Sequence, residues 1–383
     1  MTTLLVTNDF PPTVGGIQSY LQDFAAEYVS RAGADQLVVF ASTQDAEAAA
    51  SWDATVPYRV VRWPRSVMLP TPATVREMQR RIREERITTV WFGAAAPLAV
   101  MGAAAKRAGA TRVVATTHGH EVGWAMLPGG RSVLKRIGSS ADVVTYISSY
   151  TLSRFRRAFG DDVEFEWLPS GVDSGFFRPA TTAQRMATRE RFGWGNEPLI
   201  VCASRLVPRK GQDQLIRALP AVREAVPGAR LVLVGTGAAE SRLRARVTRL
   251  PSSDREAVVF AGAVSRETLR DIVASANVFA MPARTRWGGL DVEGLGIVYL
   301  EAQACGVPVV AGASGGAPET VSRETGIVVD GRDVDSLSAE LAGLLTDPER
   351  CAEMGAEGRH RAVDTFAWSR LGDHLYGILG GGR

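Results

Sequence analysis

The sequence predicts an α/β protein with two domains, each built around a parallel β-sheet with helices on both faces. Three observations support this fold class. The chain has 383 residues, more than a single hydrophobic core usually fills. Short β-rich runs alternate with longer helical runs almost throughout, as in sheets whose parallel strands are joined by helices. The stretch LPSGVDSGFFRP, residues 168–179, divides the β-rich runs into two sets of about six.

The two sets of strands predict two Rossmann-like domains that face each other across a crevice. Twelve strands are expected, at residues 3–8, 36–41, 88–93, 111–118, 142–148, 164–170, 198–204, 229–235, 257–262, 277–283, 307–312 and 326–330. The amphipathic segment 366–379 is followed by no strand, and we expect it to pack against the first domain. The domains are therefore predicted as 1–170 plus 366–383, and 171–365.

Composition and charge exclude several functional classes. A net charge of +3 gives no strong overall attraction to nucleic acid. The three cysteines lack C-x-x-C spacing, so neither a disulfide framework nor a zinc site is expected, in keeping with a reducing cytoplasm: Cys202, Cys305 and Cys351. The N-terminus lacks the pattern of a signal peptide. The most apolar stretch, residues 90–105, is too short to span a bilayer comfortably and contains a proline.

Ligands of such sheets bind beyond the carboxyl ends of the strands, so the loops there carry the candidate residues. Gly15 and Gly16 follow the first strand and precede a helix, where backbone can approach an anion closely. A flexible loop is the simpler interpretation of this pair alone. The loop lacks the G-x-G-x-x-G pattern of nicotinamide-dependent dehydrogenases. His118 ends the strand at 111–118 and is expected near the same crevice, with His120 as the weaker candidate.

The second domain opens with two cations directly after a strand. Arg205 and Lys210 lie in the loop that leads into the next helix. A planar guanidinium fork and a mobile ammonium suit a diphosphate, although an ordinary solvated pair explains them equally well from the residues alone.

The stretch DVEGLGIVYLEAQACGVPVVA, residues 291–311, carries two carboxylates around a glycine-rich helix start. A helix that begins near Gly296 leaves N–H groups free to hold a phosphate next to the two cations: Leu295, Gly296, Ile297 and Val298. Ionised carboxylates accept hydrogen bonds from vicinal sugar hydroxyls. Glu293 and Glu301 could therefore bind a hexose and a ribose with a diphosphate between them. This pattern predicts a nucleotide-sugar site.

The segment EGLGIVYLE resembles the E-x₇-E signature of retaining GT-B glycosyltransferases of family 4. Five further features agree along the chain: the Gly-Gly loop, T-x-H-G at 116–119, SGVD at 170–173, R-x₄-K at 205–210, and a terminal Trp-Ser helix. Residues 283–302 are most similar to the actinobacterial members that use GDP-mannose to add a second mannose, in α-1,6 linkage, to a phosphatidylinositol monomannoside. The resemblance implies a GT-B fold and these substrates.

The resemblance also implies roles for the donor-binding residues. Gly16 would contact the donor phosphate, and Arg205 and Lys210 would stabilise the leaving diphosphate. Val264 would offer backbone groups to the guanine, and Glu301 would hold the ribose.

The remaining implied roles concern the transferred sugar and its acceptor. Glu293 would hold the mannose 3- and 4-hydroxyls, His118 would lie near the 6-hydroxyl, and Gln18 would contact the inositol of the acceptor. No second carboxylate is placed as an obvious nucleophile, which fits a front-face retaining mechanism. The expected catalytic residues are His118, Arg205, Lys210 and Glu293.

No metal or other cofactor is expected to be required. A D-x-D sequence occurs at Asp333–Asp335, but it precedes a helix, so Asp333 is predicted to be an N-cap. The two cations and a helix N-terminus supply the charge that a diphosphate needs.

A lipid acceptor implies a membrane surface, and the predicted helix at 71–86 offers one. It places a basic stripe beside an apolar one: Arg76, Arg80 and Arg83 beside Val75, Met78 and Ile82. Ahead of it, Val67, Met68 and Leu69 form a loop expected to enter lipid. We therefore expect a cytoplasmic protein bound peripherally to the inner face of the plasma membrane, although an ordinary surface helix explains the segment equally well.

Three other functions stay open on the residues alone. A related GT-B enzyme could use another lipid or a small-molecule acceptor. A sugar-nucleotide epimerase shares the fold and two glutamates but needs no acceptor. A non-catalytic nucleotide-sugar binding protein would show no turnover.

Overall fold

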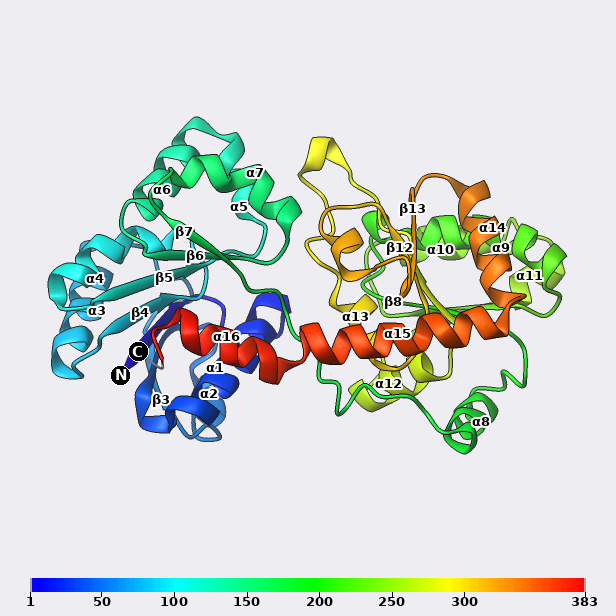
Figure 1. Ribbon diagram of the computed structural model, residues 1–383, viewed down its shortest axis with the longest axis horizontal. Coiled ribbons are helices and arrows are strands. Elements are labelled where there is room, and N and C mark those ends of the chain that lie inside the picture. Colours follow the sequence, from blue (N-terminus) through cyan, green and yellow to red (C-terminus); the bar gives the residue numbers. More distant parts are fainter. Residues whose placement is uncertain (1, 382–383) are drawn as a thin grey trace. The chain divides into compact units, whose positions relative to one another are not determined.

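The computed structural model describes residues 2–381, which form two compact units (Figure 1). The first unit comprises the residues up to Gly171 together with those from Trp368 onward. The second unit is Val172–Ala367. Each unit is a parallel sheet covered by helices on both faces, so the predicted fold class is confirmed.

The first unit contains a seven-stranded sheet in the order β3-β2-β1-β4-β5-β6-β7, with all neighbours parallel. Its strands are β1 (Thr3–Thr7), β2 (Leu37–Ser42), β3 (Arg59–Trp63), β4 (Thr89–Phe92), β5 (Arg112–Thr116), β6 (Val143–Tyr146) and β7 (Glu164–Trp167). Six of them were predicted. The strand β3 was not predicted. It is an edge strand that pairs only with β2 and is partly exposed, so its sequence, RVVRW, has arginines where a buried strand would have a continuous apolar run.

Helices enclose this sheet on both sides, and the helices on each side bury alternate residues of its strands. They are α1 (Gly16–Ala32), α2 (Ala46–Asp53), α3 (Pro72–Glu84), α4 (Gly102–Ala108), α5 (Glu121–Met126), α6 (Pro128–Gly138), α7 (Ser149–Phe159) and α16 (Trp368–Ile378). Leu4 and Val6 of β1 enter one apolar cluster and Leu5 enters the other, as the period of two in a strand requires.

The terminal helix α16 packs against α1 of the first unit, as predicted. The Trp368 and Phe24 rings meet edge to face with centroids 5.0 Å apart. A Cβ on Gly171 would lie 2.5 Å from the Trp368 ring, so the close approach of the chain to this indole requires glycine.

The second unit contains a six-stranded parallel sheet in the order β10-β9-β8-β11-β12-β13. The strands, all predicted, are β8 (Leu199–Ala203), β9 (Arg230–Val234), β10 (Val258–Gly262), β11 (Val278–Met281), β12 (Val309–Gly312) and β13 (Gly326–Val329). The helices are α8 (Thr182–Arg191), α9 (Gln212–Ala225), α10 (Glu240–Val247), α11 (Ser252–Glu256), α12 (Arg266–Ala274), α13 (Ile297–Ala304), α14 (Val334–Leu345) and α15 (Pro348–Phe366).

The strand order of each sheet reverses at one place, between β1 and β4 in the first unit and between β8 and β11 in the second. Sheets of this type bind ligands outside the carboxyl ends of the strands at such a reversal. The loops after β1, β4, β8 and β11 are therefore the places where the geometry favours a site. Across residues 2–381, no helix combines the length and the apolar character needed to cross a membrane.

Candidate active site

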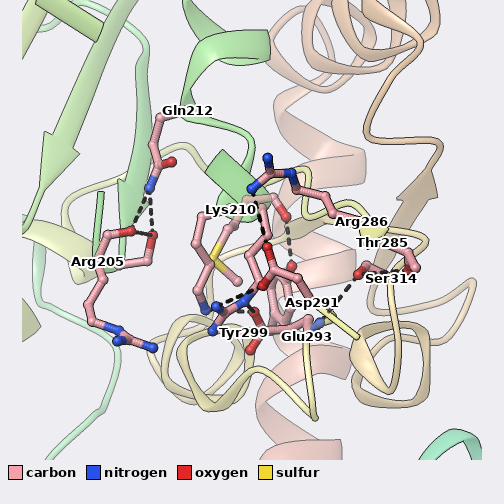
Figure 2. Close-up of polar contacts among 12 residues, drawn as sticks. Arg205, Lys210, Gln212, Thr285, Arg286, Asp291, Glu293, Tyr299 and Ser314 are labelled. Carbon is pink, nitrogen blue, oxygen red and sulfur yellow. Dashed lines mark hydrogen bonds and ion pairs between the residues drawn. The ribbon is translucent and has the colours of Figure 1, made fainter. Parts of the chain in front are cut away.

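A buried ion pair joins the loops after β8 and β11 of the second unit (Figure 2). Nζ of Lys210 lies 2.6 Å from Oε2 of Glu293, and the two residues are only 8% and 6% exposed. Two buried charges are tolerated because each compensates the other, so the pair fixes the position of both side chains. Gly211 follows Lys210 with φ 81°, and a Cβ there would lie 2.2 Å from the carbonyl oxygen of Pro282. This turn therefore requires glycine.

Charged neighbours that the sequence did not single out surround this pair. Nη1 of Arg209 lies 3.3 Å from Oδ1 of Asp291, and its Nε lies 3.7 Å from Oε2 of Glu293. Asp291 also pairs with Arg286, at 3.3 Å (Figure 2). The sequence could have pointed to Arg209 and Asp291 only through their positions, directly before Lys210 and two residues before Glu293. These contacts connect two loops into one charged cluster.

Arg205 is the free cation of this site. It is exposed, and within the described residues its guanidinium makes no hydrogen bond or ion pair. Its carbonyl oxygen accepts a hydrogen bond from Nε2 of Gln212, at 3.1 Å, which holds its backbone (Figure 2).

The charges around the ion pair leave an excess that suits a diphosphate. Apart from Arg284, which pairs with Asp213, the two loops carry four cations and two carboxylates, an excess of two positive charges: Arg205, Arg209, Lys210 and Arg286 against Asp291 and Glu293. The diphosphate of a nucleotide sugar carries two negative charges, so the site has the complementary charge.

The N-terminus of α13 adds unpaired donors, as the sequence predicted. Gly296 precedes the helix with φ 90°, and no side chain caps the first turn. Across residues 2–381, the N–H groups of 295–298 donate no hydrogen bond. Tyr299 is buried, and its hydroxyl donates to the carbonyl oxygen of Met281 at 2.6 Å, which ties the helix to the end of β11. Such a helix N-terminus favours an anion.

Glu301 and Val264 both present groups that the protein itself leaves unused. The half-buried Glu301 carboxylate has no hydrogen-bond partner in the described structure, and burial raises its pKa to about 7, although Arg266 opposes the shift. A carboxylate in this position is stabilised by a ligand that donates hydroxyl groups. Val264, between β10 and α12, is half-buried, and neither its N–H nor its carbonyl oxygen is bonded within residues 2–381.

In the first unit, the loop after β1 brings Gly16 and Gln18 to the carboxyl edge of the sheet. A Cβ on Gly16 would meet no protein atom within 4 Å, so protein packing does not require glycine there. Nε2 of Gln18 donates to Oδ1 of Asp9 at 3.1 Å. Burial raises the pKa of Asp9, and His120 opposes the shift.

His118 follows β5 and is held as a neutral hydrogen-bond acceptor. Its Nε2 lies 2.7 Å from the carbonyl oxygen of Gly93, so Nε2 carries the proton and Nδ1 keeps its lone pair. Burial lowers the pKa of His118 to about 4. Oε2 of the fully buried Glu121 accepts the backbone N–H groups of His118 and Gly119, each at 3.1 Å. Glu121 was not predicted as a site residue, and its position just after His-Gly-His was the only signal in the sequence.

The structure corrects the predicted membrane face of α3. Met78 and Ile82 are buried in the core of the first unit and Val75 packs against it, so the apolar stripe faces protein. Met68 is fully buried, and Asn8 bonds both its N–H and its carbonyl oxygen. Arg76, Arg80 and Arg83 are exposed, but Arg80 pairs with Glu77 at 2.6 Å and with Glu84 at 2.8 Å.

The D-x-D sequence has the structural role predicted for it. Oδ1 of Asp333 accepts the N–H of Ser336 at 3.0 Å and caps α14. No group of three or more His, Cys, Asp or Glu side chains arranged to hold a metal ion occurs in the part of the chain that the structure describes.

Two family sequence models match the chain, one in each half. The model of Glycosyltransferase Family 4 matches residues 14–176, and that of Glycosyl transferases group 1 matches residues 184–361. The GDP-mannose-dependent monoacylated alpha-(1-6)-phosphatidylinositol monomannoside mannosyltransferase of Corynebacterium glutamicum is 57% identical over 98% of this chain and 97% of its own length. This chain is a glycosyltransferase of family 4, with a group 1 glycosyl transferase domain in its second half. The corresponding mannosyltransferase of Mycolicibacterium smegmatis is 54% identical over 99% of this chain and 98% of that protein.

Solved structures of low sequence identity share the fold of this glycosyltransferase. Anabaena HepE in complex with UDP superposes with a TM-score of 0.80 at 21% identity over 99% of each chain. Sucrose-phosphate synthase from Thermosynechococcus elongatus gives a TM-score of 0.77 at 21% identity, over 99% of this chain and 98% of that one. The chain has the GT-B fold.

The raised pKa of Glu301 predicts a pH-dependent cost to stability. Its folded value of about 7 lies above the ordinary value of 4.5, so ionisation destabilises the folded state. The cost is absent below pH 4.5, grows between the two values and is complete above pH 7. Glu301→Gln should therefore raise the Tm at pH 8, by at least about 2 °C, and change it little at pH 5. Thermal unfolding at both values measures this, with the exposed Glu353→Gln as control. Equal shifts at the two pH values would contradict the assignment.

The open space at Gly16 predicts a variant that keeps its stability and loses function. Gly16→Ala adds a methyl group that meets no protein atom, so the Tm should stay unchanged or rise slightly. If ligand approaches the backbone here, kcat/KM for sugar transfer should fall at least tenfold. Gly377→Ala is the matched control, since a Cβ there also meets no protein atom. Unchanged kcat/KM in Gly16→Ala would remove Gly16 from the site.

Proposed function

We propose that this glycosyltransferase transfers mannose from GDP-mannose to a phosphatidylinositol monomannoside, in α-1,6 linkage and with retention at the anomeric carbon. The names of the relatives above give this donor, acceptor and linkage, at 54–57% identity over nearly the whole chain, whereas retention is implied by the resemblance to retaining enzymes of the family. The observation that supports it best is the Lys210–Glu293 pair beside the free Arg205 and the uncapped α13 N-terminus. Cations for a diphosphate and a carboxylate for a sugar lie together there.

The donor would bind the second unit through complementary polar groups. An ammonium has three N–H donors, so Lys210 can keep Glu293 and still donate to a phosphate oxygen. Glu293 would accept hydrogen bonds from the mannose 3- and 4-hydroxyls, and Glu301 from the ribose. Val264 would pair with the guanine through its unused backbone groups. Arg205 and the N–H groups of 295–298 would complete the phosphate contacts, with no metal ion required.

In the transfer step, the bond between the mannose C1 and the diphosphate oxygen breaks, and the acceptor hydroxyl attacks from the same face. The acceptor's proton passes to the departing phosphate oxygen, which gives GDP and the dimannoside. Charge accumulates on the diphosphate, where cations stabilise it most in the transition state. His118 would accept a hydrogen bond from a sugar hydroxyl through Nδ1, and Gln18, oriented by Asp9, would contact the acceptor. The roles given to Gly16, Gln18, His118 and Val264 come from the family resemblance.

A transfer assay tests this function directly. The full chain is incubated with radiolabelled GDP-mannose and phosphatidylinositol monomannoside, with and without EDTA, and the lipid is separated by chromatography. The proposal predicts a labelled dimannoside in both conditions. Isomerised sugar nucleotide without lipid product would instead identify an epimerase, and binding without turnover would identify a non-catalytic protein. Loss of product in EDTA that added magnesium restores would contradict metal independence.

Removing Lys210 should affect turnover more than GDP binding. Lys210→Ala should raise the barrier by about 3–4 kcal/mol, because the lost cation acts most strongly when the diphosphate departs. It also leaves the buried Glu293 with only the more distant Arg209, at 3.7 Å, as a counter-ion, so Lys210→Ala/Glu293→Gln serves as the folding control. Arg249→Ala, at an exposed site, is the matched charge control. Near-normal kcat in a folded Lys210→Ala protein would exclude Lys210 from the chemistry.

We further propose that the protein binds peripherally to the inner face of the plasma membrane through basic residues of the first unit. A lipid acceptor keeps its acyl chains in the bilayer, and exposed cations attract anionic lipid. On α3, Arg76 and Arg83 are exposed without carboxylate partners among the described residues, although Glu77 and Glu84 compensate Arg80.

Helices α6 and α7 give the first unit a second basic surface that could bind the membrane. Helices α6 and α7 carry six cations and no carboxylate: Arg131, Lys135, Arg136, Arg154, Arg156 and Arg157. Met126 and Leu127, which precede α6, are exposed apolar residues. This combination suits the interface of an anionic bilayer.

Vesicle sedimentation separates the two basic surfaces. The triple change of Arg76, Arg80 and Arg83 to Ser, or of Arg131, Lys135 and Arg136 to Ser, should weaken binding to phosphatidylinositol-containing vesicles at low salt. Each cation contributes about 1 kcal/mol near the surface. Changing Arg242, Arg246 and Arg249 of the second unit to Ser is the control. If neither first-unit variant binds less than this control, the proposed membrane surface is wrong.

A further inference from the structure

A cavity in the second unit lies away from the donor-site residues. It has a volume of about 560 Å³ and is lined by the segments that lead into β11 and β12, by α15, and by the chain around Pro179. Residues Cys305–Val307 at its wall directly follow the C-terminus of α13, whose N-terminus carries the candidate donor site. The cavity and the donor site therefore lie at opposite ends of one short helix.

The ionisable lining of this cavity is cationic. Arg185, Arg359 and His360 line it, and no aspartate or glutamate of the described chain does so. Two acidic groups of α15 and its N-cap, which adjoin the lining in sequence, are engaged elsewhere: Oδ1 of Asp347 caps α15 by accepting the N–H of Arg350 at 3.0 Å, and Oε1 of Glu357 lies 3.9 Å from Nδ1 of the exposed His360. Within the described residues, the lining itself therefore carries positive charge and no carboxylate, while the charge of Glu301 reaches the wall only at Cys305, where burial and Glu301 raise the pKa of the thiol.

The two arginines differ in how they are held. Nη1 of Arg359 donates to the carbonyl oxygens of Ser174, Phe177 and Ala304, at 2.8–2.9 Å, which fixes the guanidinium. Arg185, on α8, is half-buried, and within residues 2–381 its guanidinium makes no hydrogen bond or ion pair. Burial lowers the pKa of Arg185, which reflects the cost of holding an uncompensated cation there. Such a group is stabilised when an anion joins it.

Aliphatic side chains make up much of the remaining lining, together with the amide of Asn277, and they favour a ligand with an organic body over a bare ion. Val307, Leu344 and Leu345 contribute aliphatic surface, with prolines beside them. A volume of this size falls in the range of about 300–1,000 Å³ that holds small organic ligands. Two arginines match the two negative charges of a phosphate monoester, whereas a carboxylate would leave one arginine uncompensated.

We propose that this cavity is a second ligand site, which binds an organic phosphate monoester. The phosphate lies between Arg185 and Arg359, and the organic body contacts the apolar wall. The site shares no residue with the candidate donor site, and its ligand would bind whether or not the transfer reaction proposed above takes place. Because Arg359 also bonds the carbonyl oxygen of Ala304, the last residue of α13, a ligand here would act on the helix whose other end faces the donor.

Phenyl phosphate is the direct probe, because it combines a dianionic phosphate with an apolar body and carries neither nucleoside nor sugar. Calorimetry on the full chain should show binding that Arg185→Ser weakens at least tenfold. Arg191→Ser, on the exposed side of the same helix, should leave binding unchanged. Because no partner of Arg185 is lost, the variant should fold normally. Equal affinity for wild type and Arg185→Ser, or no binding at millimolar phenyl phosphate, would overturn the proposal.

Cys351 provides a second, local readout. It lines the cavity and is partly exposed, whereas Cys202 and Cys305 are 1% and 3% exposed. Phenyl phosphate should slow alkylation of Cys351 in wild type and not in Arg185→Ser, with Cys351→Ser confirming the labelled site. Benzoate at the same concentration should protect less, and equal protection would contradict the charge argument. GMP and mannose 6-phosphate, compared in the same assay, identify a nucleoside or a sugar as the preferred body.

Discussion

The buried contact between Lys210 and Glu293 is the interaction on which the candidate donor site depends. An ammonium and a carboxylate removed from water stabilise each other, so moving either one leaves the charge of the other poorly compensated. Their positions follow from backbone that only glycine allows, at Gly211 beside Lys210 and at Gly296 beside Glu293. The charge pair and the two glycines together hold a lysine, a carboxylate and a helix N-terminus in one place.

Helix α13 extends this constraint through the second unit. Tyr299 bonds its first turn to the end of β11, and Arg359 bonds the carbonyl oxygen of its last residue. These two bonds connect both ends of the helix to the structure around it. Glu301, in its middle, is the exception to this satisfied framework, because its carboxylate is half-buried and has no partner in the described structure. Burying this unpaired carboxylate destabilises the folded protein without a ligand. A ligand that donates hydroxyl groups to it would remove that destabilisation.

The sequence could predict the fold because strand and helix periods are local properties of the chain. Twelve strands and the start of α13 were identified in this way. The edge strand β3 escaped because its arginines interrupt the apolar run that marks a buried strand. On α3, helical periodicity identified an apolar stripe but could not tell which surroundings it faces. Met78 and Ile82 face the core.

Partners of the site residues were harder to predict, because they depend on which loops meet. Lys210 and Glu293 are far apart in sequence, and only the adjacency of β8 and β11 brings them into contact. For the same reason, the roles of Arg209 and Asp291 were signalled only by their closeness in sequence to Lys210 and Glu293. Glu121 was missed although its contact is local, because it looks like an ordinary helix-start glutamate in the sequence, yet its buried carboxylate holds the backbone of His118.

Titration calorimetry of Glu293→Gln with GDP and with GDP-mannose tests the central claim most directly. If Glu293 binds the sugar and Lys210 the diphosphate, neutralising Glu293 removes a hydroxyl acceptor and frees the ammonium for phosphate. GDP should then bind as well as or better than to wild type, and GDP-mannose should lose at least tenfold in affinity relative to GDP. A parallel loss of both affinities, or a loss for GDP alone, would contradict the account of this site.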